Sequence, residues 1–244
     1  MLTLIYSLIL LVACTLLYVI SFVALVVCYP FDPKRKVVHT ISKWLTDIVF
    51  GLPPMWHRRV LGAEHVDPRQ AYVIVLNHNS MVDIICFYCV PLVFKWVSKY
   101  EVYKIPYIGR FLMMHGDIII DRGSASQAMG KVMNEGKMWI DRGASVCIFP
   151  EGTRSKDGEI HRFKAGAFLL AKKAGVPILP VVLDGTKSVM RSWWRLNWRN
   201  TITISILPPI DAEKVAATDT KDLMASVHDD MVAELARIRS GKNE

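Results

Sequence analysis

The first 31 residues of this chain carry no charged side chain, and no Gly-x-Ser-x-Gly motif occurs anywhere in it. The nearest string to that motif, Gly143 to Cys147, lies in a predicted buried strand, so an obvious serine nucleophile is absent. The five cysteines give no disulfide framework. Cys86 and Cys89 lack the second ligand pair of a zinc site and fall in an apolar helical pattern. We therefore expect no metal and no serine nucleophile.

The uncharged segment ends at Asp32, and residues 2–29 are nearly all Leu, Ile, Val, Ala, Phe and Tyr. At about 1.5 Å per residue, such a helix reaches roughly 40 Å, enough to cross a ~30 Å hydrocarbon core with tilt. A signal peptide fits poorly, because no basic region precedes the segment and no small-residue cleavage pattern ends it. We expect residues 1–31 to be retained as a transmembrane or membrane-embedded anchor helix.

A basic flank follows the anchor directly at residues 34–36, and the positive-inside rule then puts the rest of the chain in the cytoplasm. Residues 37–56 predict an amphipathic helix at the membrane interface, with Trp44 and Trp56 suited to headgroup depth. We expect this interfacial segment to occupy residues 32–60. A two-helix hairpin embedded in one leaflet is the alternative topology.

The net charge of +8 and the pI of about 9.3 are compatible with nucleic-acid binding or with an anionic membrane. The basic residues are scattered, no nucleic-acid recognition motif occurs, and the apolar amino end favours the membrane. In the run 190–199, arginines alternate with Trp193, Trp194 and Trp198. This pattern favours an interfacial foot, meaning a segment that contacts the membrane interface, over a cluster on an edge strand. We expect membrane lipids, and no nucleic acid, as partners.

A strand, a polar turn and a helix are predicted around His78. The run Tyr72–Leu76 is typical of a buried strand, stops at polar Asn77, and gives way to a helical pattern from Met81. Asp83 then lies in the first helical turn, where its carboxylate can reach back to the imidazole, fix its tautomer and leave the other ring nitrogen free to accept a proton. Alone, this spacing also describes an ordinary loop histidine beside a first-turn acid.

Two later loops bring arginines to predicted strand ends. The strand Asp117–Asp121 ends at Arg122, and the strand Ser145–Phe149 is followed by a short turn. The turn contains Glu151, Gly152, Thr153 and Arg154. An arginine fork bonds two phosphate oxygens at once, glycine permits close backbone approach, and threonine offers a hydroxyl. Glu151 is expected to hold an arginine or to bond the hydroxyl of an acceptor. Either arginine alone would be an ordinary solvated charge.

Four motif blocks occur in a fixed order along the chain. They are Asn77 with His78 and Asp83, Gly116 to Arg122, Phe149 to Ser155, and Val176 to Val182. In these blocks the chain resembles the glycerolipid acyltransferase superfamily, and most closely the bacterial 1-acyl-glycerol-3-phosphate acyltransferases of the PlsC type. The resemblance covers roughly residues 71–207, and Ile119 stands where the family more usually has Phe.

The resemblance implies transfer of a fatty acyl group from a thioester to the sn-2 hydroxyl of lysophosphatidic acid, giving phosphatidic acid at the bacterial inner membrane. His78 and Asp83 would act as the general base. Arg122, Arg154 and Lys99 would bind the substrate phosphate, with Lys104 and Lys164 as further lysines that could hold an anion.

Acyl-CoA or acyl carrier protein would be the co-substrate, with no other cofactor. Other lysolipid acceptors, such as lyso-ornithine lipid or glycerol-3-phosphate, remain alternatives, as does a non-catalytic membrane lipid-binding protein that kept the fold.

Alternating strands and helices predict an α/β fold, a helix-flanked and mostly parallel sheet in residues 61–244. Ser124 and Gln127 predict the cap of a helix that continues to about Trp139. A helix is expected at 163–174, strands at 178–183 and 201–207, and a last helix at about 221–239. That helix carries a packing stripe at Leu223, Val227, Met231 and Leu235.

Overall fold

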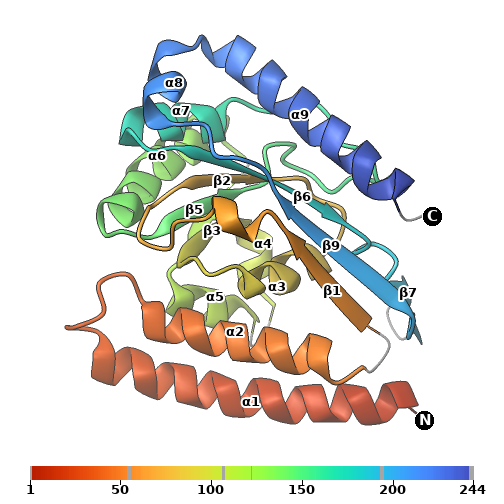
Figure 1. The fold of residues 1–244 in the computed structure, drawn as a ribbon. Helices are drawn as coiled ribbons and strands as arrows, with labels where there is room; N and C mark the ends of the chain where they lie inside the picture. Colours follow the sequence, from red (N-terminus) through yellow and green to blue (C-terminus); the bar gives the residue numbers. More distant parts are fainter. Residues whose placement is uncertain (1, 54–55, 106–107, 122, 193–194, 242–244) are drawn as a thin grey trace.

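The computed structural model describes residues 2–53, 56–105, 108–121, 123–192 and 195–241. Its centre is a seven-stranded sheet in the order β1-β9-β6-β2-β5-β3-β4 (Figure 1). The strands are β1 Trp56–Leu61, β2 Val73–Leu76, β3 Phe94–Lys99, β4 Ile118–Ile120, β5 Ser145–Ile148, β6 Ile178–Asp184 and β9 Asn200–Ile206. All pairings are parallel except that of β6 with β9. The predicted α/β class and mostly parallel sheet are confirmed.

Helices cover both faces of the sheet (Figure 1). One face carries α6 Ala125–Asp141, α7 Gly166–Ala174, α8 Ala212–Ala217 and α9 Thr220–Ser240. The other carries α1 Leu2–Cys28, α2 Lys36–Gly51, α3 Val82–Cys86, α4 Tyr100–Tyr103 and α5 Ile108–His115. Short 3-10 turns occur at η1 Ala63–His65 and η2 Phe87–Cys89, and a small hairpin pairs β7 Met190–Ser192 with β8 Arg195–Leu196. The sheet is therefore buried on both sides.

The alternation of side chains along β2 shows why its apolar run is continuous. Val73 and Val75 point into the core beneath α6, α7 and α9, whereas Ile74 and Leu76 point into the core beneath α2 and α3. All four side chains are fully buried. Successive strand residues face opposite sides, so a strand covered on both faces has no polar position to offer. β2 thus lies in the middle of the molecule and delivers the next residues to its carboxyl edge.

Sequence expectations for the later elements are largely confirmed. Ser124 caps α6 by accepting a hydrogen bond from the Gln127 amide at 3.4 Å, and the predicted stripe of α9 is buried. Helix α7 begins at Gly166, three residues later than expected. In the preceding segment, the Lys164 amide donates to the carbonyl of Pro150 at 2.9 Å, so the chain there still belongs to the loop that follows β5.

Strand β1 corrects two details of the expected interfacial segment. It pairs with β9 from Trp56 to Leu61, so the boundary expected at residue 60 falls inside a strand. Trp56 is only 8% exposed, so it does not lie at headgroup depth as expected. Its Nε1 donates to the carbonyl of Asn197 at 2.7 Å, and its ring packs beside Tyr6 and Trp198. Trp193 and Trp194, also expected in the interfacial foot, lie outside the described residues.

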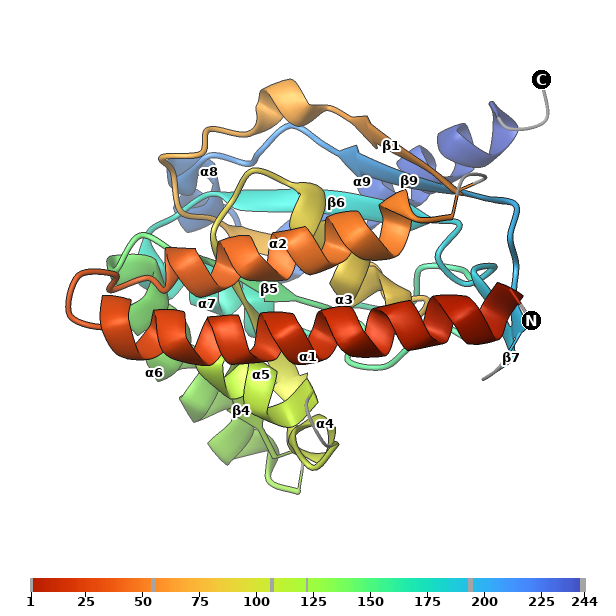
Figure 2. The ribbon, with the colours of Figure 1, turned by 90° about the horizontal axis from the view of Figure 1, so that it is seen from below.

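Helices α1 and α2 run side by side beneath the domain (Figures 1 and 2). The segment Thr3–Cys28 is long and apolar enough to cross a membrane, with a mean hydropathy of 2.8 over its most apolar window. One face of α1 packs inward at Tyr6, Leu17 and Ser21, and the Tyr6 hydroxyl donates to the carbonyl of Val49 in α2 at 2.8 Å. Most of the other large side chains of α1 are exposed, whereas Leu10, Tyr18 and Leu25 are partly buried.

Candidate active site

The carboxyl end of β2 carries His78 and is fixed to its neighbour β6 by Asn77. The Asn77 side chain donates from Nδ2 to the Leu183 carbonyl at 2.9 Å and accepts from the Leu183 amide at Oδ1 at 2.7 Å. This side chain continues the sheet ladder by one step beyond the strand. His78 therefore leaves the sheet from a rigid base, with β5 on one side and β6 on the other. The sequence places Asn77 at the end of a strand and in the first motif block, but it does not predict these two bonds.

The two predicted dyad residues are in contact. His78 Nδ1 lies 2.8 Å from Asp83 Oδ2, the Asp83 side chain is fully buried, and 13% of the His78 side chain is exposed. The same carboxylate oxygen accepts the amides of Asn79 and Ser80, each at 2.7 Å. Because an ionised carboxylate only accepts hydrogen bonds, this geometry places the hydrogen on Nδ1 and leaves the lone pair on Nε2.

Two aromatic rings hold the plane of the imidazole. Phe149 stacks on His78 with ring centroids 3.9 Å apart and planes inclined by 16°. Trp96 stacks on the other side of Phe149 at 5.1 Å and 11°. Trp96 is buried in the core beneath α3, so the stack is anchored in the sheet. Sequence reasoning missed this support, since aromatic residues in β3 and at the end of β5 have the pattern of ordinary core residues.

Glu151 lies behind the dyad loop and is almost completely buried. Its Oε1 accepts the amide of His78 at 2.9 Å, and its Oε2 accepts the amide of His161 at 3.0 Å. Burial raises the pKa of this carboxyl, and the two amide hydrogen bonds oppose that rise. The carboxylate thus ties the His78 turn to the loop after β5. The contact with an arginine or an acceptor hydroxyl expected from the sequence stays a prediction.

A cavity of about 560 Å³ opens in front of His78. One part of its wall is polar and contains Lys99, Thr153, Arg154 and Lys164 together with His78. The rest is apolar and includes Val97, Val102, Ile120, Met129, Val132, Ile148 and Ala167. The predicted base and two of the predicted phosphate ligands therefore share one cavity. Arg122, the third predicted phosphate ligand, lies outside the described residues.

The lysines at this cavity differ in their surroundings. Lys99 forms an ion pair with Glu101 at 2.8 Å, with both side chains partly exposed. Lys104, the competing lysine of the same segment, lies over the ring of Tyr100 at 5.0 Å and does not line the cavity. Lys164 closes over Gly152, where an added Cβ would lie 2.7 Å from its Nζ. Gly152 also has a φ of +74°, so its backbone conformation favours glycine at this position.

The described part of the chain contains no group of three or more His, Cys, Asp or Glu side chains that could hold a metal ion. Its five cysteines are unpaired, and Cys86 donates to the Asp83 carbonyl at 3.4 Å within the core. The side chains that line the cavity include the imidazole of His78, the hydroxyl of Thr153 and the cations of Lys99, Arg154 and Lys164.

Comparison with known proteins agrees with this site. The sequence profile described as Acyltransferase matches residues 57–184, more than half of the chain. The chain belongs to this acyltransferase family. The matched region contains the whole dyad, both arginine loops and strands β1 to β6.

Relatives in the family carry one name in distant organisms. A 1-acyl-sn-glycerol-3-phosphate acyltransferase of Borreliella burgdorferi is 30% identical over 206 residues, covering 82% of this chain and 76% of that protein. The chloroplastic acyltransferase LPAT1 of Arabidopsis thaliana is 36% identical over 163 residues, covering 66% of this chain and 45% of that protein. The chain thus spans about half the length of the plant relatives it matches.

A solved structure has the same fold. The 1-acyl-sn-glycerophosphate acyltransferase PlsC of Thermotoga maritima superposes with a TM-score of 0.69 and 22% sequence identity. The match covers 96% of this chain and 98% of that one, so it includes the two amino-terminal helices as well as the sheet.

Proposed function

We propose that this protein transfers a fatty acyl group from an acyl thioester to the sn-2 hydroxyl of lysophosphatidic acid, which gives phosphatidic acid. The observation that carries the proposal is the His78–Asp83 pair at the wall of a cavity that is lined by both cationic and apolar side chains. The names of the relatives from Borreliella and Arabidopsis agree with this acceptor.

His78 has one nitrogen committed to Asp83 and the other available to substrate. In the proposed reaction, Nε2 takes the proton of the acceptor hydroxyl as its oxygen attacks the thioester carbonyl. The carbon–oxygen bond of the new ester forms and the carbon–sulfur bond breaks. The imidazolium then returns the proton to the departing thiolate. Asp83 stabilises the imidazolium during this step, because its buried charge lies 2.8 Å from Nδ1.

The cationic side chains that line the cavity fit the phosphate of the acceptor. Arg154 and Lys164 come from the loop after β5, and Lys99 comes from the end of β3. Arg122 belongs to the same proposal on sequence grounds. An arginine can bond two phosphate oxygens at once, so Arg154 also restricts how the glycerol backbone is turned toward His78.

The apolar side chains at the cavity fit a fatty acyl chain. They come from elements that include α6, α7, β4 and β5, with Met129, Val132 and Ala167 among them. Acyl-CoA and acyl carrier protein remain the two proposed donors. Both present the same thioester to His78, and they differ in what they place outside the cavity.

We further propose that α1 and α2 lie in the plane of one leaflet of the inner membrane, with the active site on the cytoplasmic side. Support comes from the contact of α1 with α2 and from the burial of His39 and Ile41 of α2 against the domain. A helix that crossed the bilayer upright would have to give up the bond between Tyr6 and the Val49 carbonyl. The exposed apolar face of α1 would then enter the hydrocarbon region.

Product analysis tests the acyl transfer. Purified protein is incubated with a labelled acyl thioester, as acyl-CoA or acyl carrier protein, and a panel of lysophosphatidic acid, lyso-ornithine lipid and glycerol-3-phosphate. We expect phosphatidic acid as the main product. A preference for another acceptor would replace lysophosphatidic acid in the proposal, and absence of any transfer would leave lipid binding as the function.

Vesicle binding tests the in-plane helix. Leu16 and Val23 are 58% and 54% exposed and lie two turns apart on α1. Changing both to Glu should weaken sedimentation with vesicles of phosphatidylcholine and phosphatidylglycerol by at least about tenfold, since each buried side chain contributes about 1.5–3 kcal/mol. The control is Val232→Glu, at an exposed position of α9, a helix that covers the face of the sheet opposite α1 (Figure 1). Equal binding of both variants would contradict the proposal.

A further inference from the structure

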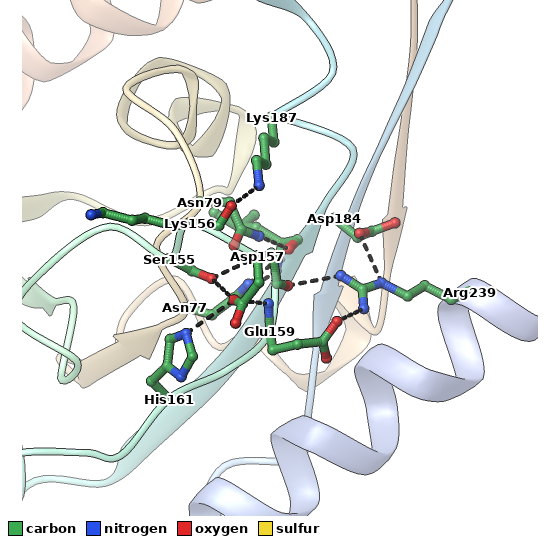
Figure 3. Close-up of polar contacts among 12 residues, drawn as sticks. Asn77, Asn79, Ser155, Lys156, Asp157, Glu159, His161, Asp184, Lys187 and Arg239 are labelled. Carbon is green, nitrogen blue, oxygen red and sulfur yellow. Dashed lines mark hydrogen bonds and ion pairs between the residues drawn. The ribbon is translucent and has the colours of Figure 1, made fainter.

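An arginine of the last helix reaches the loop that follows the active site. Arg239 lies near the end of α9, and its guanidinium contacts three acceptors (Figure 3). Nη2 donates to the Gly158 carbonyl at 2.8 Å, Nη1 donates to Glu159 Oε1 at 2.7 Å, and Nε donates to Asp184 Oδ1 at 3.4 Å. One side chain thus joins the loop 155–161 to the end of β6 and to α9.

Both ends of the loop 155–161 are attached to the dyad segment. At one end, the Ser155 amide donates to the His78 carbonyl at 2.7 Å. At the other, the His161 amide donates to Glu151 Oε2 at 3.0 Å, and Oε1 of the same carboxylate accepts the His78 amide. The loop is therefore anchored at both ends to the dyad segment.

The interior of the loop is cross-linked, so it moves as a unit. Ser155 Oγ donates to Asp157 Oδ1 at 2.8 Å and accepts the Gly158 amide at 2.9 Å. The Glu159 amide donates to the same Asp157 oxygen at 3.0 Å. Gly158 has a φ of +93°, and a Cβ there would lie 3.4 Å from Arg239 Nη2. Gly158, whose carbonyl Arg239 binds, is therefore bonded through its amide to Ser155.

The side of the loop away from the active site offers little packing. There Asp157 and Gly158 line an open polar cavity of about 660 Å³, whose other walls include His57, Thr201 and Arg199. Apart from Arg239, a second tie on this side is a hydrogen bond from Lys187 Nζ to the Lys156 carbonyl (Figure 3). Within the loop, Ile160 is buried in the core, whereas polar contacts to α9 and to the segment after β6 hold the part around Lys156, Gly158 and Glu159.

We propose that Arg239 is a positioning residue for acceptor binding, a latch that fixes the loop 155–161 and through it Arg154. The proposal rests on the acyl transfer proposed above, in which Arg154 binds the acceptor phosphate. Arg154 directly precedes the anchored Ser155, so release of the latch frees the arginine from its place at the cavity. The His78–Asp83 contact lies within the segment 78–83 and does not depend on Arg239.

The chain offers a matched control two residues away. Arg237 is on the same helix and pairs with Glu234 of that helix at 2.7 Å, and within the described part of the chain its side chain makes no hydrogen bond or ion pair with the loop. Both arginines are partly exposed, and exposed ion pairs contribute little to stability. If Arg239 served only the helix, then the two substitutions would have the same consequence.

Steady-state kinetics of the full chain carries the first half of the test. Arg239→Ala should raise KM for lysophosphatidic acid by about five- to tenfold, with kcat and the donor KM each within about twofold of wild type. Arg239→Lys should recover part of the loss, and Arg237→Ala should match wild type. A wild-type acceptor KM in Arg239→Ala, or the same change in Arg237→Ala, would overturn the proposal.

Hydrogen–deuterium exchange carries the second half and needs no activity. Arg239→Ala should speed exchange of the amides of Ser155, Gly158, Glu159 and His161 by at least about fivefold, and Arg237→Ala should leave them at wild-type rates. Unchanged exchange rates of these amides in Arg239→Ala would contradict the proposal that Arg239 fixes the loop. If wild-type protein transfers no acyl group to any lysolipid, then the proposed function fails, while the exchange result still decides whether the latch exists.

Discussion

Two of the histidine–aspartate pairs in the described residues, His78–Asp83 and His115–Asp117, have nearly the same length but lie in very different surroundings. His78 Nδ1 lies 2.8 Å from Asp83, and His115 Nδ1 lies 2.7 Å from Asp117. The first histidine is partly exposed at a cavity, whereas both side chains of the second pair are completely buried. Contact between imidazole and carboxylate is therefore not sufficient for a general base. What separates the pairs is access of the second ring nitrogen to a substrate.

The second nitrogen of His115 is occupied by another part of the core. His115 Nε2 lies 3.0 Å from His39 Nδ1 of α2, and Lys95 donates to the His115 carbonyl at 2.7 Å. Burial lowers the pKa of both histidines well below the usual value, and the charge of Lys95 lowers it further. Burial also raises the pKa of Asp117 to about 7 and lowers that of Lys95 to about 7. This network joins α2 to β3 and the start of β4.

Substitution of the two histidines should separate the pairs most strongly. His78→Ala should lower kcat by about 10²–10⁴-fold, the usual contribution of a general base, while the unfolding midpoint stays near that of wild type. His115→Gln should keep turnover within a fewfold, since its ring does not line the cavity. Rates at saturating substrates and thermal unfolding measure both effects. A wild-type rate in His78→Ala would refute the role of the exposed pair.

Substitution of the two aspartates should affect stability in the opposite order, with the larger loss at the buried pair. Asp117→Ala leaves the buried Lys95 without its nearby negative charge, and it removes the acceptor of the Trp96 amide. Loss of one partner from a buried charged group costs about 3–5 kcal/mol, which urea unfolding in detergent would detect. Asp83→Asn should be milder in stability but should lower the rate, because it favours the wrong tautomer of His78. If the Asp117→Ala protein were as stable as wild type, the distinction between a buried structural pair and an exposed pair at the cavity would not hold.

The next prediction concerns how the acceptor binds beside the exposed pair, His78 and Asp83. Arg154→Ala should raise KM for lysophosphatidic acid about tenfold to a hundredfold, the equivalent of one charge-assisted hydrogen bond, and leave the donor KM nearly unchanged. Initial rates with each substrate varied in turn give both constants. An effect confined to the donor would assign Arg154 to the phosphates of the thioester carrier.

Much of this arrangement could be predicted from local sequence patterns. The apolar run of β2, the first-turn position of Asp83 and the strand ends before Arg122 and Pro150 all follow from periodicity over a few residues. The α/β class follows from the alternation of such runs. These features depend on neighbours in the chain, which is why one sequence suffices for them.

Other parts depend on contacts between distant segments and could not be predicted. The stacking of Trp96 and Phe149 on His78, the bonds of Glu151 to two backbone amides and the grip of Arg239 on Gly158 join residues far apart in sequence. Strand β1 was missed because its partner β9 lies more than 140 residues later in the chain. The polar residues of β1 resemble a basic membrane flank until that partner is known.

The pH dependence of stability gives the finest test of the buried pair. The His39 pKa is lowered in the folded protein by burial, by His115 and by Lys95, so below about pH 6.5 the unfolded chain holds a proton that the folded protein does not. Stability is therefore lost as the pH falls below 6.5, at about 1.4 kcal/mol per pH unit for each such group. The raised pKa of Asp117 acts in the opposite direction, because the folded protein takes up that proton first.

A single substitution isolates the share of His39. His39→Gln removes one titrating group and keeps a side chain that can bond His115, whereas His115 and Asp117 are present in both proteins and largely cancel in the difference. Between pH 6.5 and 5.5, wild type should therefore lose about 1 kcal/mol more unfolding free energy than the variant, measured by urea titration at each pH. The two proteins should run parallel above pH 7, where His39 is neutral in both states. Parallel curves below pH 6.5 as well would mean that His39 is protonated in the fold, and the contrast between a buried neutral network and an exposed catalytic pair would no longer hold.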